Sequence, residues 1–508
     1  MDNIRIYNTL RRQKEDFIPR DRGKVGIYVC GPTVYGYVHV GNARPYVFFA
    51  VLSRYLRHLG YKVNLVENLT DVDDKIIERA NNEGVTAEAI ARQFSAAYIE
   101  DTDRLGLGRP DIEPKATEHI EEIIELCEQL VEAGYAYETG GSVYYRVCEF
   151  PGYGKLSGQK TDKMKHCVLA REGEAKKSPL DFAIWKAAKP GEPSWESPWG
   201  QGRPGWHIEC TAMSLKYLGV KFDIHGGGRD LIFPHHENEI AQAEAVTGRG
   251  FAKYWMHNGM ITRKDEKMSK SVGNIFLLRE LLKKYDPRAL ILFFMSSHYR
   301  SPLEFSEHKL DEAATQLERF RNCFWKAESV ISGAGGSEDV SGSHVGAADA
   351  ARGAGISGSR VGTADAASAG RFTTSLSDAM VRVQERFDEE MRDDINTAGA
   401  LAAVFGLVKT VNDYAENASL TGEADTELLS QAKDLLASLL AILGVEITSD
   451  EYTESAIEQE LLDLVQQREE ARRNRDFAAA DDARDRVDAA GYEIRDTPQG
   501  PKLVRKSP

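Results

Sequence analysis

The sequence places a histidine, a glycine and an asparagine together where a strand pattern gives way to a helix pattern. His39-Val40-Gly41-Asn42 follows the β-branched run Val25–Val29, and an apolar helical pattern continues from Ala43 to Leu59. Backbone N–H groups and the positive end of the helix dipole converge at such a point, which favours phosphate binding. His39 and Asn42 could donate to a phosphate, and Gly41 lets a nucleotide approach the backbone. Taken alone, this pattern is more often a simple turn.

Two lysines three residues apart lie on a Ser/Gly-rich segment further along the chain. The segment reads Lys267-Met268-Ser269-Lys270-Ser271, with Arg263 and Lys264 before it and Gly273 after it. A mobile cationic loop of this kind could bind a leaving pyrophosphate. The alternative is a solvated basic loop, which is the default for an isolated run of charge.

Two thiols, an imidazole and a carboxylate could together hold a metal ion: Cys30, Cys210, His235 and Glu239. Cys30 ends the first predicted strand, at the edge where doubly wound sheets bind ligands. Pro234 suits the first position of a helix, which would place His235 and Glu239, spaced i and i+4, on one helix face. Such a set matches the ligands of zinc. Spacing alone leaves rival ligands open: His207, His225, His236 and Glu237.

The elements that carry these groups alternate in the α/β manner. The run Lys62–Val66 predicts a second strand after the 43–59 helix, which completes a right-handed βαβ unit. Strand patterns return at 220–224 and 254–256. We therefore predict a Rossmann-like, doubly wound parallel sheet over residues 1–305, with a connective domain inserted at about 110–205.

The second half of the chain has a different pattern. Residues 306–450 are largely helix-periodic and predict a helical bundle, interrupted by the Gly/Ala/Ser-rich stretch 332–370. Within that stretch SGSHVGAADAA, from Ser341, returns as SGSRVGTADAA, from Ser357. Two copies cannot build a solenoid core, so we expect a flexible surface insertion. Residues 451–508 predict a small separate module.

Composition limits the classes of function. The 508 residues carry a formal net charge of −15, which excludes a general nucleic-acid coating protein and restricts any RNA contact to local basic patches. No apolar run is long enough to span a membrane and the N-terminus carries no signal-peptide pattern, so we expect a cytoplasmic protein without membrane contact. Six cysteines are too few for a disulfide scaffold, which fits a reducing compartment.

In this order and on this frame, the histidine and lysine motifs resemble the HIGH and KMSKS signatures of class I aminoacyl-tRNA synthetases. Asn42 replaces the last histidine of HIGH, as in some members of the family. The blocks CGPTVYGYVHVGNARPYV, NLTDVDDKI, GRPGWHIECTAMS, DIHGGGRDLIFPHHENEIAQ and EKMSKSVGN are similar to those of cysteinyl-tRNA synthetases. They cover residues 1 to about 305.

The resemblance implies an enzyme that uses ATP and magnesium to convert L-cysteine to cysteinyl-adenylate, and then transfers cysteine to the 3′ end of tRNA(Cys). It also implies one zinc ion per subunit, held by Cys30, Cys210, His235 and Glu239. Zinc binds a deprotonated thiol strongly and a serine hydroxyl poorly, so the metal would separate two near-isosteric amino acids that a pocket based on size separates poorly.

The resemblance further implies roles for individual residues. The catalytic set would be His39, Asn42, Lys267 and Lys270. ATP would be bound by His39, Gly41, Asn42, Gly227, Asp230 and Lys270. Thr70 and Trp206 would bind cysteine, although Trp206 could equally be a core residue. The remaining cysteines are expected to be structural: Cys127, Cys148, Cys167 and Cys323.

The C-terminal half resembles the same family less specifically. Residues 387–397 are similar to its stem-helix domain, and 468–491 to its small anticodon-reading module, although Gly500–Val504 departs from the family pattern. We expect a monomer. Two alternatives remain open here: a cysteine ligase of mycothiol synthesis, which resembles a shortened synthetase, and a non-catalytic tRNA- or zinc-binding paralogue, in which damaged signature motifs are expected.

Overall fold

The structure is a computed structural model, and it describes residues 4–159, 176–263, 266–267, 276–333, 366–490, 492–497 and 500–505. The chain divides into two compact units. The first unit comprises residues 1–314, 385–403 and 440–445, and the second comprises 315–384, 404–439 and 446–508. Among the described residues, no helix is both long enough and apolar enough to cross a membrane.

A four-stranded parallel sheet forms the centre of the first unit. Its strands are β3 (Lys24–Val29), β4 (Lys62–Glu67), β9 (Phe222–Gly228) and β10 (Ala252–Asn258), in the order β10-β9-β3-β4. The prediction of a Rossmann-like parallel sheet is confirmed. Because the chain moves from β3 to β4 on one side and later to β9 on the other, the strand order reverses around β3, where ligands bind in folds of this kind.

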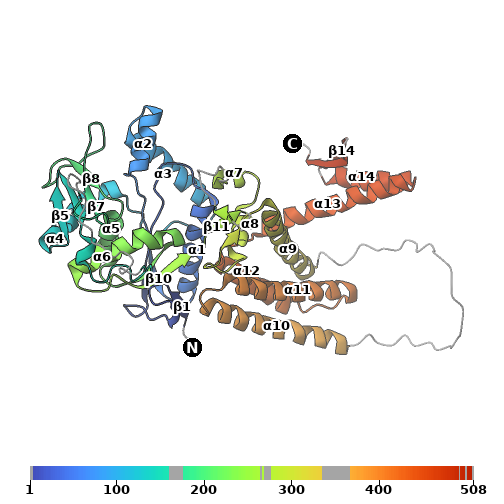
Figure 1. The fold of residues 1–508 in the computed structure, drawn as a ribbon. Coiled ribbons are helices and arrows are strands. Elements are labelled where there is room, and N and C mark those ends of the chain that lie inside the picture. The colour runs from blue at the N-terminus through green and yellow to red at the C-terminus, as the bar shows by residue number, and fades with distance from the viewer. Residues whose placement is uncertain are drawn as a thin grey trace, which may run out of the picture. The chain divides into compact units, whose positions relative to one another are not determined.

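Helices cover both faces of this sheet. Helix α1 (Val40–His58) contacts β4, β9 and β10 and is drawn in blue in Figure 1. Phe49 of α1 packs on Gly226, whereas Leu218 of α5 (Ile208–Leu218) packs on Gly26. Gly226 lies opposite Val29 in the register, and side chains alternate along a strand, so α1 and α5 lie on opposite faces. This double cover explains why the strands are almost continuously buried.

The predicted connective insertion contains its own antiparallel sheet, in the order β5-β6-β7-β8. Its elements are η1 (Ala116–Glu118), α4 (Ile120–Glu132), β5 (Ala136–Thr139), β6 (Ser142–Tyr145), η2 (Val147–Glu149), β7 (Phe182–Ala187) and β8 (Gly202–Pro204). Its core includes Leu126, Val143 and Trp185. Helices α2 (Asp74–Glu83) and α3 (Ala87–Asp103) precede the insertion, and α6 (Glu237–Thr247) joins β9 to β10.

Short elements complete the first unit. They are β1 (Arg5–Asn8), β2 (Gln13–Asp16), η3 (Arg229–Leu231), β11 (Ile261–Arg263), β12 (Glu266–Lys267), α7 (Leu278–Leu281), α8 (Pro287–Met295) and β13 (Leu303–Glu304). Strand β11 pairs with both β12 and β13. Of the predicted KMSKS segment, only the backbone of Lys267 belongs to the described part of the chain.

The C-terminal half is mostly helical, as predicted. Its helices are α9 (Glu307–Ile331), α10 (Ala366–Arg392), α11 (Thr397–Thr421), α12 (Thr426–Ile442), α13 (Ser449–Arg473) and α14 (Phe477–Ala489), followed by the hairpin β14 (Tyr492–Thr497) and β15 (Gly500–Arg505). Residues 334–365 of the predicted low-complexity insertion lie outside the described residues, and α10 begins inside its predicted range. Helices α13 and α14 share a small core that includes Leu464 and Val487.

Candidate active site

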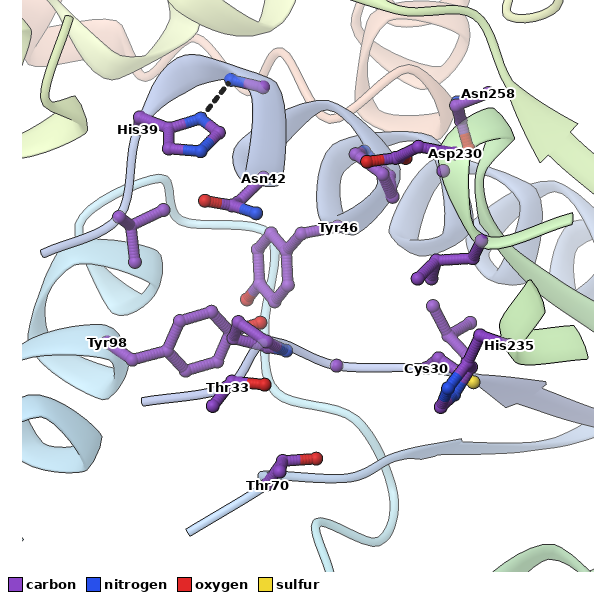
Figure 2. A pocket seen from close by; sticks show the side chains of 18 of the residues that line it. Cys30, Thr33, His39, Asn42, Tyr46, Thr70, Tyr98, Asp230, His235 and Asn258 are labelled. Atoms are coloured by element: carbon purple, nitrogen blue, oxygen red, sulfur yellow. Dashed lines mark hydrogen bonds between the residues drawn. The ribbon is translucent and has the colours of Figure 1, made fainter. Parts of the chain in front are cut away.

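A cavity of about 310 Å³ lies at the carboxyl ends of the central strands. Its lining comes from the segment after β3, from the ends of β4, β9 and β10, and from the start of α1. Figure 2 shows side chains from these segments around one space. The parallel sheet therefore brings together groups that are up to about two hundred residues apart, such as Cys30 and Asp230.

The four predicted metal ligands meet beside this cavity. One ligand atom from each of Cys30, Cys210, His235 and Glu239 lies within 4.8 Å of the other three, and all four residues are buried. Glu239 Oε1 is 3.1 Å from His235 Nε2 and 3.4 Å from Cys30 Sγ. Cys30, Cys210 and His235 line the cavity. A ligand in the cavity could therefore reach an ion held by this set.

The helix start predicted near His235 is wrong in one detail. Helix α6 begins at Glu237, and Pro234 and His235 belong to a π-helical turn, Ile232–His236, with an extended residue, Phe233, inside it. Pro234 is therefore not the first residue of the helix. The turn nevertheless places His235 against Glu239.

The rival ligands proposed from spacing separate into three cases. Glu237 accepts hydrogen bonds from the backbone N–H groups of Leu156 (3.1 Å) and Ser157 (2.8 Å), so it anchors α6 to the connective insertion. His207 Nδ1 lies 2.9 Å from His235 Nδ1. His225 and His236 form a second compact group with Cys30 and Glu239.

The first group fits an accessible metal better than the second. His225 Nε2 lies 2.8 Å from Glu239 Oε2, while Glu239 Oε1 faces His235 and Cys30. His225 is thus placed to orient the carboxylate of Glu239, a proposed metal ligand, as outer-shell groups do in metal sites. Neither His225 nor His236 lines the cavity, and their group contains one sulfur where the first contains two.

Burial sets the protonation of these groups. It raises the pKa of Cys30, with a further increase from the neighbouring Cys210, and it raises the pKa of Cys210 to about 11. Burial also lowers the pKa of His235. Without a cation the two thiols and the imidazole are therefore uncharged. A bound cation would displace the two thiol protons, as metal binding by cysteine requires.

Thr70 and Trp206, the two residues predicted to bind cysteine, both line the cavity. The hydroxyl of Thr70 donates to Glu209 Oε1 (2.9 Å) and accepts from Asn68 Nδ2 (3.2 Å). The indole ring of Trp206 lies 4.7 Å from the imidazole of His235, measured between centroids. Trp206 is 36% exposed, so it is a wall of the cavity and not a core residue.

His39, Gly41 and Asn42 lie at the start of α1 and line the cavity. His39 is the N-cap residue, and its Nδ1 accepts from the backbone N–H of Gly41 at 3.1 Å (Figure 2). A Cβ atom on Gly41 would lie 2.9 Å from the His39 ring, so glycine is needed for this cap. The start of α1 is also tied to a segment near α7. The backbone N–H of Val40 donates to the carbonyl of Phe276, and the N–H of Leu278 donates to the carbonyl of Val38.

The remaining predicted residues are placed less completely. Asp230 lines the cavity, and so does Gly228, whereas Gly227, which was predicted to bind ATP, does not. A Cβ on Gly227 would lie 3.0 Å from Leu231 and 3.1 Å from His236, which indicates a packing role. Lys270 and the side chain of Lys267 fall outside the described residues.

Sequence reasoning missed two buried polar groups of the cavity wall. Glu67, the last residue of β4, accepts a hydrogen bond from the Tyr98 hydroxyl, and burial raises the pKa of Glu67 to about 7. Asn258, the last residue of β10, is also buried. Both follow buried strands at the carboxyl edge of the sheet. A polar residue at that position was the signal that could have identified them.

Comparisons with known proteins agree with this architecture. Residues 16–315 match the family model for the catalytic domain of class I (C) tRNA synthetases, and residues 386–448 match the DALR domain. The cysteine–tRNA ligase of Geobacter sulfurreducens is 46% identical over 98% of both chains, and that of Geobacillus thermodenitrificans is 45% identical over the whole of both. The chain belongs to the cysteine–tRNA ligase family. As a member of this family of class I aminoacyl-tRNA synthetases, it is a ligase.

Solved synthetase structures share the fold at low sequence identity. A Mycobacterium tuberculosis methionyl-tRNA synthetase in complex with methionyl-adenylate aligns with a TM-score of 0.60 and 16% identity, covering 90% of this chain and 96% of the other. A leucyl enzyme from Agrobacterium radiobacter aligns with a TM-score of 0.58 and 12% identity, covering 87% and 86%. These likenesses support the fold assigned to this cysteine–tRNA ligase family member.

The cysteines outside the cluster have other surroundings. Cys127 and Cys323 are buried thiols, and burial raises the pKa of each. Cys148 is disulfide-bonded, which differs from the reduced state expected for the cysteines of this chain. Cys167 lies outside the described residues.

Proposed function

We propose that this protein is a cysteine–tRNA ligase that activates L-cysteine with ATP, releases pyrophosphate and transfers cysteine to the 3′ end of tRNA(Cys). The observation that carries the proposal is the meeting of two thiols, an imidazole and a carboxylate at one end of a cavity. The same cavity is lined by the histidine and asparagine at the start of α1. A sulfur-selecting group and a phosphate-binding group would thus face one substrate space.

The donor set fits zinc. Two sulfurs, one nitrogen and one oxygen are ordinary zinc ligands, and a tetrahedral site would hold them roughly 3.3–3.7 Å apart. The separations of 3.1 and 3.4 Å around Glu239 Oε1 are already close to that spacing. We propose Cys30, Cys210, His235 and Glu239 as the ligands. When bound, zinc would supply a soft acceptor for the substrate thiolate, which the hydroxyl of serine would not match.

The chain's own residues would orient the amino acid beside the metal. Trp206 would close one wall over the cysteine side chain. Thr70 gives its hydroxyl proton to Glu209 and receives one from Asn68, so its remaining lone pair can only accept. In free cysteine the carboxylate only accepts, whereas the ammonium donates. Thr70 is therefore suited to the substrate ammonium.

Activation requires the cysteine carboxylate to attack the α-phosphorus of ATP in line, so the protein must position the phosphates and neutralise their charge. We propose that His39 and Asn42 donate to the phosphates and that Gly41 keeps the backbone close to them. Lys267 and Lys270, together with magnesium, would neutralise the pyrophosphate that leaves. Asp230 would bind the nucleoside side of ATP.

The C-terminal half would bind tRNA. The DALR match at residues 386–448 supports this role. Because the net charge of the chain is −15, we expect tRNA contacts to be confined to local basic patches. We propose that residues 1–305 carry the catalytic function, and that residues 306–450 and 451–508 are the two domains that serve tRNA binding.

The direct experiment is aminoacylation of tRNA(Cys) with cysteine or serine, with and without chelation of the metal. Charging with cysteine that is lost on chelation and restored by zinc is expected, with serine inactive throughout. Cysteine-dependent ATP–pyrophosphate exchange without any tRNA charging would contradict the transfer step. Joining of cysteine to glucosaminyl-inositol would assign the chain to the mycothiol ligases instead.

A further inference from the structure

Asn258 carries a buried amide that has no hydrogen-bonding partner within the described part of the chain. The residue is 2% exposed, and both its Oδ1 and its Nδ2 atoms are buried and unpaired among the described residues. Its side chain lines the cavity, and Figure 2 shows it near Asp230 and across the cavity from Tyr98. Buried amides that remain unpaired destabilise a fold, so such a group needs a partner from outside the chain, either an ordered water or a ligand. Because this amide lines the cavity, a ligand in the cavity could supply that partner.

The backbone around Asn258 is held rigidly. The N–H of Gly259 donates to Tyr299 (2.7 Å), while its carbonyl accepts from the buried guanidinium of Arg44 (2.7 Å), which also binds Ser301 (2.8 Å). A Cβ atom on Gly259 would lie 2.1 Å from the carbonyl oxygen of Ser301, so this contact is tight. The amide of Asn258 therefore cannot find a partner by a shift of its own backbone.

The neighbouring strand leaves room beside this amide. Gly228 is paired with Asn258 in the β9–β10 register and also lines the cavity. A Cβ on Gly228 would lie 2.6 Å from Asp230 Oδ1, so any larger residue would disturb the adjacent carboxylate. The absence of a side chain at this position lets a flat group approach the end of β10.

The chemistry of the amide selects among the ligands of the proposed reaction. An asparagine presents an acceptor and a donor side by side, which matches the amino group and adjacent ring nitrogen of adenine. Phosphate oxygens only accept, and the amino acid is expected at the cluster end of the cavity. We infer that Asn258 binds the base of ATP, with the adenine amino group donating to Oδ1 and Nδ2 donating to a ring nitrogen. The inference deepens the proposed function and rests on it.

The test compares three nucleotides in cysteine-dependent ATP–pyrophosphate exchange by the full chain: ATP, 2′-deoxy-ATP and purine riboside triphosphate, which lacks the amino group. For the wild type, kcat/KM should fall roughly 10-fold or more when the amino group is removed. Asn258→Leu, which has a similar shape, should raise KM for ATP by a similar factor, leave KM for cysteine unchanged and abolish the preference for ATP over the purine analogue.

Thermal unfolding without ligands supplies an independent readout. Because the amide of Asn258 is unpaired, Asn258→Leu should raise the melting temperature. The matched control is Asn68→Leu, which should lower it, because Asn68 is equally buried but accepts from Gly31 (3.1 Å) and donates to Thr70 (3.2 Å). A lower melting temperature for Asn258→Leu would assign the residue a structural role.

Besides a lower melting temperature for Asn258→Leu, three outcomes overturn the inference. They are an unchanged ATP preference in Asn258→Leu, an equal use of ATP and the purine analogue by the wild type, and a loss in the variant of discrimination against 2′-deoxy-ATP alone, which would move the contact to the ribose. A wild type without cysteine-dependent exchange would contradict the proposed function instead. Calorimetric binding of the three nucleotides would then decide the role of Asn258 separately.

Discussion

The two ends of the cavity are built in opposite ways. At the cluster end, every donor already contacts another: Glu239 Oε1 lies between His235 and Cys30, and Glu239 Oε2 is held by His225. At the other end, Asn258 is buried, and neither of its polar side-chain atoms has a partner in the residues that the structure describes. A resident ion needs ligands assembled in advance, whereas a substrate that leaves in every turnover can complete the hydrogen bonds itself. We therefore expect the cluster end to hold an ion that stays bound and the Asn258 end to hold a substrate that leaves in each turnover.

Removing a sulfur from the cluster should have the largest effect. Cys210→Ser replaces a ligand thiolate by a hydroxyl, so we expect loss of bound zinc and a fall in cysteine-dependent exchange of more than about 100-fold, beyond the loss typical of an outer-shell change. Zinc content and exchange rate measure both. Cys127→Ser, at a buried thiol in the connective insertion, is the control and should keep both. Full zinc content in Cys210→Ser would contradict the ligand assignment.

A substitution of His39, at the start of α1, should lower the rate of catalysis without changing metal binding. In His39→Asn the new side chain can still cap α1, because asparagine is a favoured N-cap residue. The imidazole is lost, so exchange should fall roughly 100- to 1,000-fold, the scale of a missing transition-state donor. Melting temperature and zinc content should stay near the wild-type values. A loss of zinc from His39→Asn would show that the start of α1 and the metal cluster are not independent.

Glu67, on the cavity wall, should make stability depend on pH. Its folded pKa of about 7 lies above its ordinary value of 4.5 because of burial. The raised pKa favours the protonated form in the fold, so its contribution is fully present below pH 4.5 and is lost as the pH rises towards 7 and above. Glu67→Gln stays neutral and can still accept from Tyr98. Its stability relative to the wild type should therefore increase over this range by at most roughly 3 kcal/mol.

Denaturant unfolding of both proteins at pH 5 and pH 8 measures this difference. Tyr98→Phe is the control, because it keeps the carboxyl group and should keep the loss of stability with pH. An identical pH dependence for Glu67→Gln and the wild type would show that Glu67 is not held in its neutral form.

The smallest effect should come from the support behind the cluster. His225→Gln removes the imidazole that contacts Glu239 Oε2 without removing a proposed ligand. Zinc affinity should fall roughly 10- to 100-fold, as for other outer-shell partners. Competition with a chelator measures the affinity. Exchange at saturating zinc should remain close to wild type, and a complete loss of metal would instead make His225 a ligand.

Much of this arrangement could be predicted because it depends on local sequence. The apolar run before Cys30 and the polar start of α1 are local signals, and the carboxyl edge of a parallel sheet then brings them together. The start of α6 at Glu237 was not predictable, since Pro234 fits a helix start equally well and the irregular turn depends on its surroundings.

The unpredicted features depend on distant contacts. The pKa of Glu67 is set by burial under elements that include Tyr98 of α3, and burial is not written in the local sequence. The isolation of the Asn258 amide depends on a glycine in β9 and on a rigid loop held by Arg44. That this amide is unpaired can be recognised only when the residues around it have been placed in three dimensions.

The central claim is that substrate sulfur binds a metal held by Cys30, Cys210, His235 and Glu239. Zinc K-edge absorption of the zinc-loaded protein tests it directly, because a zinc–sulfur distance of about 2.3 Å is distinct from zinc–nitrogen and zinc–oxygen distances. We expect two sulfur neighbours of the zinc ion without substrate, three with cysteine and two with serine. An unchanged sulfur count on addition of saturating cysteine would contradict it.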